Sequence, residues 1–423
     1  MYSFWDKKAK RFIVLTLFVD DGFVCCRNKE EAMMVLCLFY SHGMKLTGVI
    51  RPKIHLGYGL TYYRSKLNGS MHMTIDVDQY FAKLFSKYQD RINQRKRART
   101  LPHDPTMSDK TFELAFIKDE TEYRKSQVTE ARAVTGELMY ACGKTAIDIV
   151  SPTNRLARTQ VRPSPLWWEL VDAILQYLAT DAKRKPALMY YAARKDASLF
   201  PMICGSSDAS WRLTLNNRSM IGVLVCLGWG DRWSVVKHSG SLCKSVSLST
   251  ADSESYGLCK QFSSLLSIAN PLKQEGIDST PWPSGDNSAS LITAVTGNRK
   301  AMAYQSVYME SNYDSIKRGL VHKPMHNVTN GNWTDPLSKC MKSASDKRHK
   351  TDALLISRNS PEFLAEFEEL PESECNIEIT MKEIHDACKS YGFKLSQQIE
   401  DELIAAQREA ERIKETLEKY EHK

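Results

Sequence analysis

The spacing of hydrophobic and polar residues changes several times along the chain, and each spacing predicts a different kind of element. Apolar residues 12–19 meet Asp20-Asp21-Gly22 and resume at 23–26, which predicts a β-hairpin with two acids and a glycine at its turn. Further apolar runs follow at strand spacing and then at helical spacing. Up to residue 195 we expect strands at 54–63 and 71–75, helices at 29–40, 76–88, 126–142 and 165–179, and a loop at 100–121.

From residue 199 onward, short strand-like runs alternate with amphipathic helices, which is typical of an α/β domain. Two helices are expected at 247–268 and 288–295, the first with Ser249 and Thr250 as candidate N-caps. The expected strands of this region cover 200–205, 220–227, 233–238, 281–285 and 320–327.

The C-terminal part follows a third pattern, in which apolar residues recur at alternating steps of four and three between charged faces. Such spacing is the a/d seam of a coiled coil, and it is sustained here for three heptads. It predicts a helix over about 396–420 that associates with itself, with another chain or with the rest of the protein. The seam residues are Ile399, Leu403, Ala406, Ala410, Ile413, Leu417 and Tyr420.

Composition and charge indicate a globular protein with a polyanionic partner. Of the 423 residues, 42% are hydrophobic and 26% are charged, which excludes a fully disordered or collagen-like chain and suggests two or three domains. The net charge of +8 is uneven, because residues 361–423 carry a balance of −9 and residues 1–360 a balance of +17. A basic body suits a polyanion, and an acidic tail suggests a separate module.

Cysteine usage and the lack of an export pattern predict an intracellular protein, cytoplasmic and/or nuclear. The eleven cysteines are scattered, without a CxxC pair or a zinc-like Cys/His spacing, which fits a reducing compartment. The first residues lack a signal-peptide pattern, and no apolar run is long enough to span a bilayer. We therefore expect no membrane partner.

Two sets of acids are candidates for metal-dependent chemistry. Adjacent carboxylates at the hairpin turn, Asp20 and Asp21, can hold Mg²⁺ against substrate phosphates, although Asp also simply favours turns. The second set lies at expected strand ends and helix starts, where acids can converge and share two divalent cations that cleave a phosphodiester. Each of its members also fits as a capping or loop acid. The set is Asp208, Glu254, Asp286 and Asp335.

Basic and aromatic residues are candidates for contact with nucleic acid. Two short cationic clusters suit phosphate contact or a nuclear-import signal, and they equally suit a solvated surface. Trp167 and Trp168 could stack on bases, but at helical positions they also suit the core. The clusters are Arg95, Lys96, Arg97 and Arg99, and Lys183, Arg184 and Lys185.

Taken in order, these stretches resemble the polymerase–ribonuclease H part of a copia-type long-terminal-repeat retrotransposon polyprotein. Phe18-Val19-Asp20-Asp21 resembles the polymerase hairpin of that family, and Leu56-Gly57 resembles its next palm strand. The likeness runs collinearly over about residues 10–340. The stretches that resemble the nuclease acid motifs are Ser207-Asp208-Ala209-Ser210-Trp211, Ser247-Leu248-Ser249-Thr250-Ala251-Asp252-Ser253-Glu254, Asp286-Asn287 and Thr334-Asp335-Pro336-Leu337-Ser338-Lys339.

The resemblance implies an α/β protein that acts on an RNA–DNA hybrid or a template–primer duplex with Mg²⁺ or Mn²⁺. Asp208, Glu254, Asp286 and Asp335 would hold the nuclease metals, and Asp20 and Asp21 would be polymerase metal ligands. The expected parts are a partial reverse-transcriptase palm at 1–100, thumb or connection helices at 101–195, a ribonuclease H-like domain with a five-stranded mixed sheet at 196–342, and an acidic helical tail at 343–423.

Departures from the family pattern lower the expected polymerase activity. The family has fingers and a further catalytic aspartate upstream of the hairpin, and this chain starts about ten residues before it. Gly22 follows the double aspartate where the family has a methionine-like residue, and the lysine–histidine pattern near 301–314 is poorly kept. We therefore expect ribonuclease H-type cleavage with impaired polymerisation. The alternative is a decayed or repurposed nucleic-acid-binding protein that uses its heptad tail.

Overall fold

The structure is a computed structural model in which the chain forms two compact units, Gly57–Leu370 and Met1–Leu56 together with Pro371–Lys423. Within the second of these units, the start and the end of the chain fold together. The residues described are 2–6, 11–18, 21–25, 28–44, 48–93, 99–191, 202–229, 232–274, 279–297, 306–327, 332–352, 354–397, 399, 401, 405, 408 and 412.

The unit that contains both ends of the chain begins with an antiparallel sheet of β1 (Tyr2–Asp6), β2 (Arg11–Phe18) and β3 (Asp21–Cys25). Phe18 pairs with Asp21 across β2 and β3, so the predicted hairpin is confirmed, while Val19 and Asp20 lie outside the described residues. Helix α1 (Lys29–Ser41) is also close to its prediction. Two short strands, β4 (Gly48–Ile50) and β5 (Ile54–His55), complete the first part of this unit.

The C-terminal part of the same unit packs on its N-terminal part. Strand β16 (Ile377–Ile379) pairs with β4, and α14 (Met381–Tyr391) packs on α1 around a small apolar core. Ile399, the first residue of the predicted heptad seam, is buried in that core. The remaining seam residues, Leu403, Ala406, Ala410, Ile413, Leu417 and Tyr420, lie outside the described residues.

The larger unit contains an antiparallel sheet built from distant parts of the sequence, in the order β14-β8-β7-β6-β15. The tail that we expected to be helical therefore supplies two strands here, in addition to α12 (Ala344–Thr351) and α13 (Pro361–Glu366). The strands are β6 (Tyr58–Ser65), β7 (Met71–Asp76), β8 (Pro186–Tyr190), β14 (Ile356–Ser357) and β15 (Phe367–Glu369).

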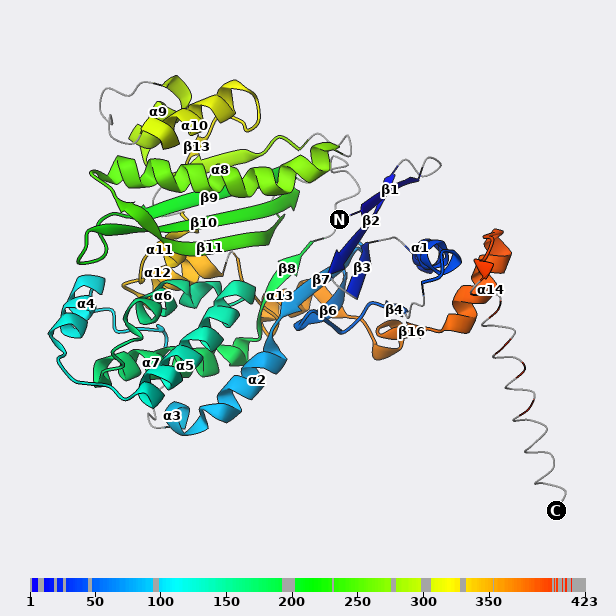
Figure 1. The fold of residues 1–423 in the computed structure, drawn as a ribbon, viewed down its shortest axis with the longest axis horizontal. Coiled ribbons are helices and arrows are strands. Elements are labelled where there is room, and N and C mark those ends of the chain that lie inside the picture. The colour runs from blue at the N-terminus through cyan, green and yellow to red at the C-terminus, as the bar shows by residue number, and fades with distance from the viewer. Residues whose placement is uncertain are drawn as a thin grey trace, which may run out of the picture. The chain divides into compact units, whose positions relative to one another are not determined.

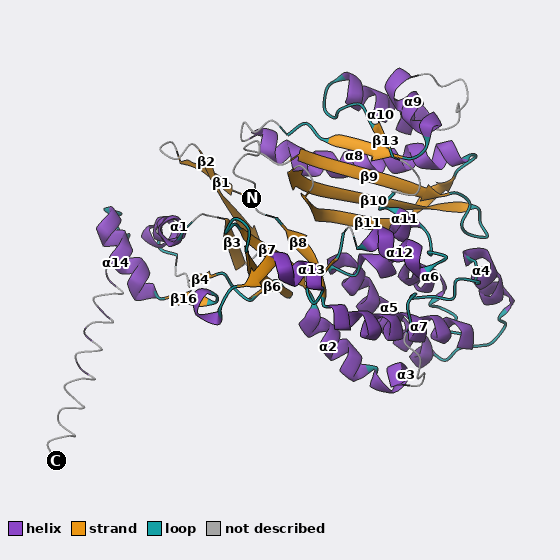
Figure 2. Ribbon diagram, turned by 180° about the vertical axis from the view of Figure 1, so that it is seen from behind, coloured by secondary structure: helices purple, strands orange, loops and turns teal. Residues whose placement is uncertain are grey.

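The larger unit also contains a five-stranded sheet, and a group of helices, α2 to α7, lies on one side of it (Figure 2). Trp167 is 1% exposed and donates its indole N–H to the carbonyl of Leu156, so it is a core residue. The expectation of a loop at 100–121 was wrong, because α4 forms there with Ser108 as its N-cap. The helices are α2 (Asp78–Lys87), α3 (Gln89–Asn93), α4 (Asp109–Lys118), α5 (Lys125–Lys144), α6 (Val150–Thr159) and α7 (Pro165–Asp181).

The second sheet has five strands in the order β11-β10-β9-β12-β13, and it is mixed, as predicted. Strands β9, β10 and β11 are antiparallel, whereas β12 runs parallel to β9 and β13 runs parallel to β12. The strands are β9 (Met202–Ser210), β10 (Arg218–Trp229), β11 (Arg232–Val246), β12 (Trp282–Gly285) and β13 (Met325–His326).

Helices cover both faces of this mixed sheet (Figure 1). The long α8 (Thr250–Gln274) lies along one face, and α11 (Asp335–Ser338) contacts the other. Both approaches are close: a Cβ on Gly205 would lie 2.9 Å from the Gln261 amide, and one on Gly222 would lie 2.8 Å from the carbonyl oxygen of Thr334. Two more helices, α9 (Ser288–Thr296) and α10 (Ser306–Lys317), complete this part of the chain.

The fold is therefore mixed α/β, as the sequence predicts. No helix among the described residues is long and apolar enough to cross a membrane.

Candidate metal centre

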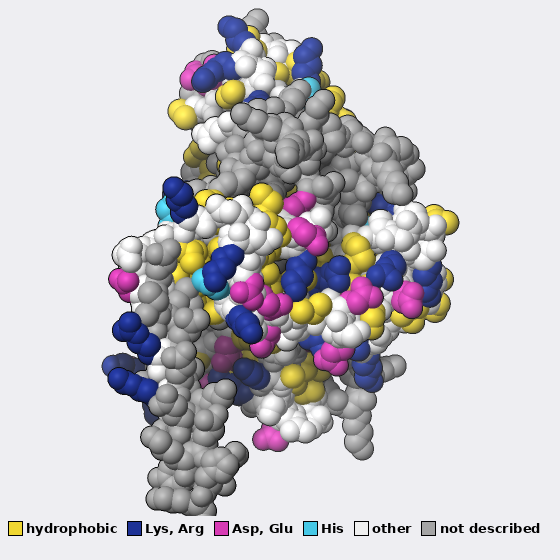
Figure 3. All heavy atoms as spheres, turned by 90° about the vertical axis from the view of Figure 1, so that its right-hand side faces the viewer, with side chains coloured by type: hydrophobic (Ala, Val, Ile, Leu, Met, Phe, Trp, Pro, Cys, Tyr) yellow, Lys and Arg dark blue, Asp and Glu magenta, His cyan; other side chains and the backbone are white. Residues whose placement is uncertain are grey.

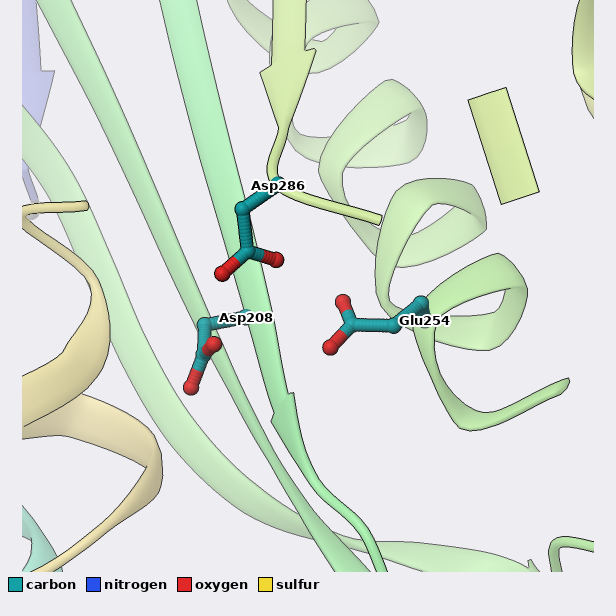
Figure 4. A group of neighbouring side chains, drawn as sticks. All are labelled: Asp208, Glu254 and Asp286. Atoms are coloured by element: carbon teal, nitrogen blue, oxygen red, sulfur yellow. The ribbon is translucent and has the colours of Figure 1, made fainter. Parts of the chain in front are cut away.

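Three of the four predicted nuclease acids come together at one edge of the mixed sheet. Asp208 lies near the end of β9, Asp286 directly follows β12, and Glu254 lies near the start of α8. Because β9 and β12 are parallel neighbours, the ends of these two strands meet at the same edge. One carboxylate oxygen from each acid lies within 4.8 Å of the others, and the three carboxyl groups face a common space (Figure 4).

Local hydrogen bonds fix the elements that carry these acids. Helix α8 begins with a reciprocal cap, in which Ser249 accepts from the backbone of Asp252 and the Asp252 carboxylate accepts from the backbone of Leu248. The predicted N-cap role of Ser249 is thereby confirmed. Asn287 caps α9 by accepting from the backbone of Ser290, which holds Asp286 between a strand end and a helix start.

Two acids of the cluster, Asp208 and Glu254, are buried, and Asp286 is partly exposed. Asp208 is 2% exposed and Glu254 is 6% exposed. The backbone N–H of Ala209 donates to Glu254 Oε1 at 3.1 Å, and the hydroxyl of Ser338 donates to Asp208 Oδ2. The side-chain amide of Asn332 also donates to Asp208 Oδ1, at 3.4 Å. Polar neighbours thus orient the acids, and Lys339 Nζ, 3.6 Å from Asp208 Oδ1, partly balances their charge.

Burial and mutual repulsion shift the protonation of the two most enclosed acids. Burial raises the pKa of Asp208 to about 6; the charge of Lys339 opposes this rise, and the charges of Asp335 and Asp286 add to it. The pKa of Glu254 is raised well above its usual value, first by burial and then by Asp208 and Asp286. Gathering these acids therefore costs free energy in the absence of a cation.

The residues present fit a hard divalent cation. Every donor in the cluster is a carboxylate oxygen, which is the ligand type that Mg²⁺ and Mn²⁺ prefer, and neither sulfur nor imidazole takes part. Strongly perturbed carboxyl groups that converge at one strand edge are also typical of functional sites. The three acids are therefore candidates for holding one such ion.

The fourth predicted acid, Asp335, lies at the start of α11 and has a different environment. Its Oδ1 is 2.8 Å from Lys339 Nζ, and its Oδ2 pairs with Lys350 Nζ. Among the described residues, it is not grouped with the three acids that could hold a metal. Its predicted role as a metal ligand, like the catalytic roles of the other three acids, stays a prediction.

The two lysines on Asp335 and the two groups on Asp208 are neighbours that our sequence reasoning did not single out. Lys339 and Ser338 were visible only as part of the motif that contains Asp335. Asn332 precedes that motif, and Lys350 lies in a separate helix. No spacing rule indicates that Lys350 would reach the acid, because its position depends on how α12 packs.

The predicted nucleic-acid contacts are only partly described. Arg95, Lys96 and Arg97 lie outside the described residues, as does the side chain of Arg184. Lys183 and Lys185 are exposed, and their carbonyls accept hydrogen bonds from Asn359 and Arg358, respectively. Arg99 lines a small cavity with Arg155 and Glu169.

Over the described part of the surface in Figure 3, basic and acidic side chains are interspersed. Of the two tryptophans, Trp168 is partly buried. The guanidinium carbon of Arg91 lies over its ring, 4.0 Å from the ring centroid. The structure gives no side-chain position for the two predicted polymerase acids. Asp20 lies outside the described residues, and the side chain of Asp21 is not described.

Comparisons with known proteins give little further information. Neither a protein-family model nor a curated protein matches the chain. Among solved structures, the chain is similar to LC11-RNase H1, a ribonuclease H1 isolated from compost by a metagenomic approach, with 13% identity and a TM-score of 0.26. That match covers 32% of this chain and 92% of the compost protein. Because the TM-score is so low, this likeness supports no conclusion about fold or function.

Proposed function

We propose that this protein is a divalent-metal-dependent nuclease that hydrolyses the RNA strand of RNA–DNA hybrids. The observation that carries the proposal is the convergence of Asp208, Glu254 and Asp286 from three separate parts of the fold into one carboxylate cluster, in which Asp208 and Glu254 are buried. A two-metal or one-metal phosphodiesterase needs such a cluster, because carboxylates position the ion and hold it against the scissile phosphate.

Each residue then has a distinct part. Asp208, Glu254 and Asp286 would hold Mg²⁺ or Mn²⁺, and Asp335 would lie beside them, paired with Lys339. When bound, the ion supplies Lewis-acid polarisation of the phosphate and a nucleophilic water at neutral pH. Ser338 and Asn332 orient the Asp208 carboxylate by donating to its two oxygens.

The finer identity that we propose is a copia-type retrotransposon element. Its support is the collinear order of motifs in the sequence, together with the five-stranded mixed sheet that carries the three acids. In this proposal residues 196–342 form the ribonuclease H-like part and 1–100 a partial palm. Polymerase chemistry at Asp20 and Asp21 is a separate proposal. It rests on the sequence alone, because the structure describes neither of these two side chains.

The test is cleavage of a hybrid labelled on its RNA strand, in Mg²⁺, by the wild-type protein and by Asp208→Asn. The matched control is Asp314→Asn, which removes an exposed aspartate of α10 outside the cluster. We expect cleavage by the wild type and the control only. Equal cleavage by all three, or cleavage by none, contradicts the proposal. Hybrid binding without cleavage would favour the decayed, nucleic-acid-binding alternative.

A further inference from the structure

Two lysines occupy the side of the metal centre on which the fourth acid lies. Lys339 Nζ lies between two carboxylates, 2.8 Å from Asp335 Oδ1 and 3.6 Å from Asp208 Oδ1. Lys350 Nζ pairs with Asp335 Oδ2 from the opposite side. Both oxygens of Asp335 therefore already have a cationic partner from the protein itself.

These two lysines differ in exposure. The side chain of Lys350 is 5% exposed, and that of its partner Asp335 is 3% exposed, so this ion pair is buried. The side chain of Lys339 is 37% exposed, which leaves its ammonium group open to a ligand outside the protein. Lys350 also lies 3.4 Å from Asp346, whose side chain is 44% exposed.

A second buried contact fixes the helix that carries Lys350. One turn earlier in α12, Lys347 Nζ lies 3.0 Å from Asp148 Oδ2 and bonds to the hydroxyl of Tyr177, and all three side chains are buried. Asp148 and Tyr177 belong to the helical region next to the sheet. The contacts of Lys347 anchor α12, and this anchored helix brings Lys350 within reach of Asp335.

The position of the lysines limits where cations can bind. A divalent ion between Asp208 and Asp335 would lie beside two ammonium groups and would be repelled by both. Among the described residues, the cation beside the space between Asp208, Glu254 and Asp286 is Lys339, whose Nζ lies 3.6 Å from Asp208 Oδ1, and Lys350 pairs with Asp335 instead. One side of the centre thus favours a metal ion and the other excludes it.

We propose that the centre takes one divalent cation, and that the ammonium of Lys339 replaces a second one and contacts a phosphate oxygen of the bound nucleic acid. This inference rests on the proposed function, since it names the phosphate as ligand. In this arrangement Asp335 is a positioning residue, because it holds Lys339 beside Asp208. Lys350 balances the charge of Asp335 and keeps that carboxylate from binding a metal.

The first experiment counts Mn²⁺ ions bound per protein by isothermal titration calorimetry, alone and with a nuclease-resistant 2′-O-methyl RNA–DNA duplex. We expect one equivalent for the wild type and two for Lys339→Gln, which removes the ammonium. The charge-preserving Lys339→Arg and the control Lys110→Gln, on an exposed lysine of α4, should each bind one equivalent.

The second experiment measures the salt dependence of binding to the same duplex in EDTA. Loss of one phosphate contact should lower the slope of log affinity against log salt by about one for Lys339→Gln, but not for Lys339→Arg. Lys110→Gln reports how much any lysine loss lowers the slope.

Each outcome has a definite meaning. Two equivalents in the wild type would overturn the single-cation inference while leaving the proposed function intact. One equivalent in Lys339→Gln would overturn the role of Lys339 in excluding a second cation. A slope equal to that of the wild type would overturn the phosphate contact. A folded wild type that binds no Mn²⁺ under either condition would contradict the proposed function as well.

Discussion

Two groups of buried carboxylates in the larger unit have opposite electrostatic surroundings. In the helical region, Asp109 of α4 accepts from Arg155 at 3.0 and 2.9 Å and from Arg158 at 2.7 Å. Arg158 also donates to Glu113 at 2.9 Å. In the metal centre, Asp208 and Glu254 are as deeply buried, but they face each other and Asp286, and the nearest cation among the described residues is Lys339, 3.6 Å from Asp208.

The difference is visible in protonation. Burial opposes ionisation of Asp109, yet hydrogen bonds and charge from Arg155 and Arg158 hold the pKa of that carboxyl below its usual value. In the metal centre, burial and neighbouring carboxylates raise the pKa of Asp208 to about 6 and that of Glu254 well above its usual value. Burial of an acid alone therefore does not mark a site, whereas a shortage of nearby cations does.

The comparison is tested most strongly by removing one acid from the metal centre. Asp208→Asn keeps the shape of the side chain but deletes a charged ligand, and metal ions supply several kcal/mol of transition-state stabilisation. Hybrid cleavage should fall by about 10²–10⁴-fold, as measured by initial rates under saturating Mg²⁺. Asp109→Asn should retain the wild-type rate under conditions where it stays folded. Equal losses in both variants would contradict the distinction between the two groups.

The arginine network should instead show its importance in stability. Arg155→Met leaves the buried carboxylate of Asp109 without its bidentate partner, and breaking a buried pair in this way typically costs about 3–5 kcal/mol. The expected result is a clear fall in the urea midpoint followed by circular dichroism. The control is Arg132→Met, on an exposed residue of α5, which should change little. A similar small shift in both would show that the network is not a stabilising element.

The metal centre should respond to pH in the opposite sense from Asp109. The pKa of Asp208 is raised in the folded state. Between about pH 4 and about pH 6, the carboxyl group therefore keeps its proton in the folded protein and loses it in the unfolded protein. The stabilising contribution of the protonated acid is present below about pH 4 and is lost as the pH rises through about 6. For Asp109, whose pKa is lowered, stability is lost as the pH falls.

Ionisation of the buried Asp208 carboxyl destabilises the folded protein near pH 7.5, and Asp208→Asn removes this cost. In EDTA at that pH, the free energy of unfolding of the variant should therefore exceed that of the wild type by on the order of 1–3 kcal/mol. The gap should close towards pH 4.5. Added Mg²⁺ should raise the thermal midpoint of the wild type near pH 7.5, and the midpoint of the variant should stay unchanged. A gap that is constant across this pH range would show that Asp208 does not titrate as described.

The smallest effect is expected for an exposed ion pair outside both groups. Asp314 of α10 pairs at 3.2 Å with Arg318, which directly follows that helix, and both side chains are more than half exposed. Such i,i+4 pairs contribute about 0.3–0.5 kcal/mol, so Arg318→Ala should barely shift the thermal midpoint, and raising salt should remove the remaining difference. A loss comparable to that of Arg155→Met would mean that exposure does not distinguish these pairs.

Much of the site-bearing fold could be predicted from local pattern. The strands that contain Asp208 and precede Asp286 were visible as apolar runs, and Ser249 marked the start of the helix that carries Glu254. These features depend on neighbouring residues, so periodicity and capping rules apply to them. The mixed order of the five strands came from the family resemblance.

The remainder depends on contacts between distant parts of the sequence, which periodicity does not encode. Helix α4 was missed because prolines and aspartates before it indicated a loop. The pairing of β15 with β6 joins residues about 300 apart, so no local signal predicts it. Likewise, the ion pair of Lys350 with Asp335 follows from the packing of α12.

The central claim is that the carboxylates short of cationic partners bind a divalent cation and that those of the arginine network do not. Anomalous scattering from crystals of the protein soaked in Mn²⁺ tests this claim most directly. We predict a manganese peak among Asp208, Glu254 and Asp286, and none at Asp109 or Glu113. The absence of a peak among the three acids, in crystals where the soak places manganese elsewhere, would contradict the account.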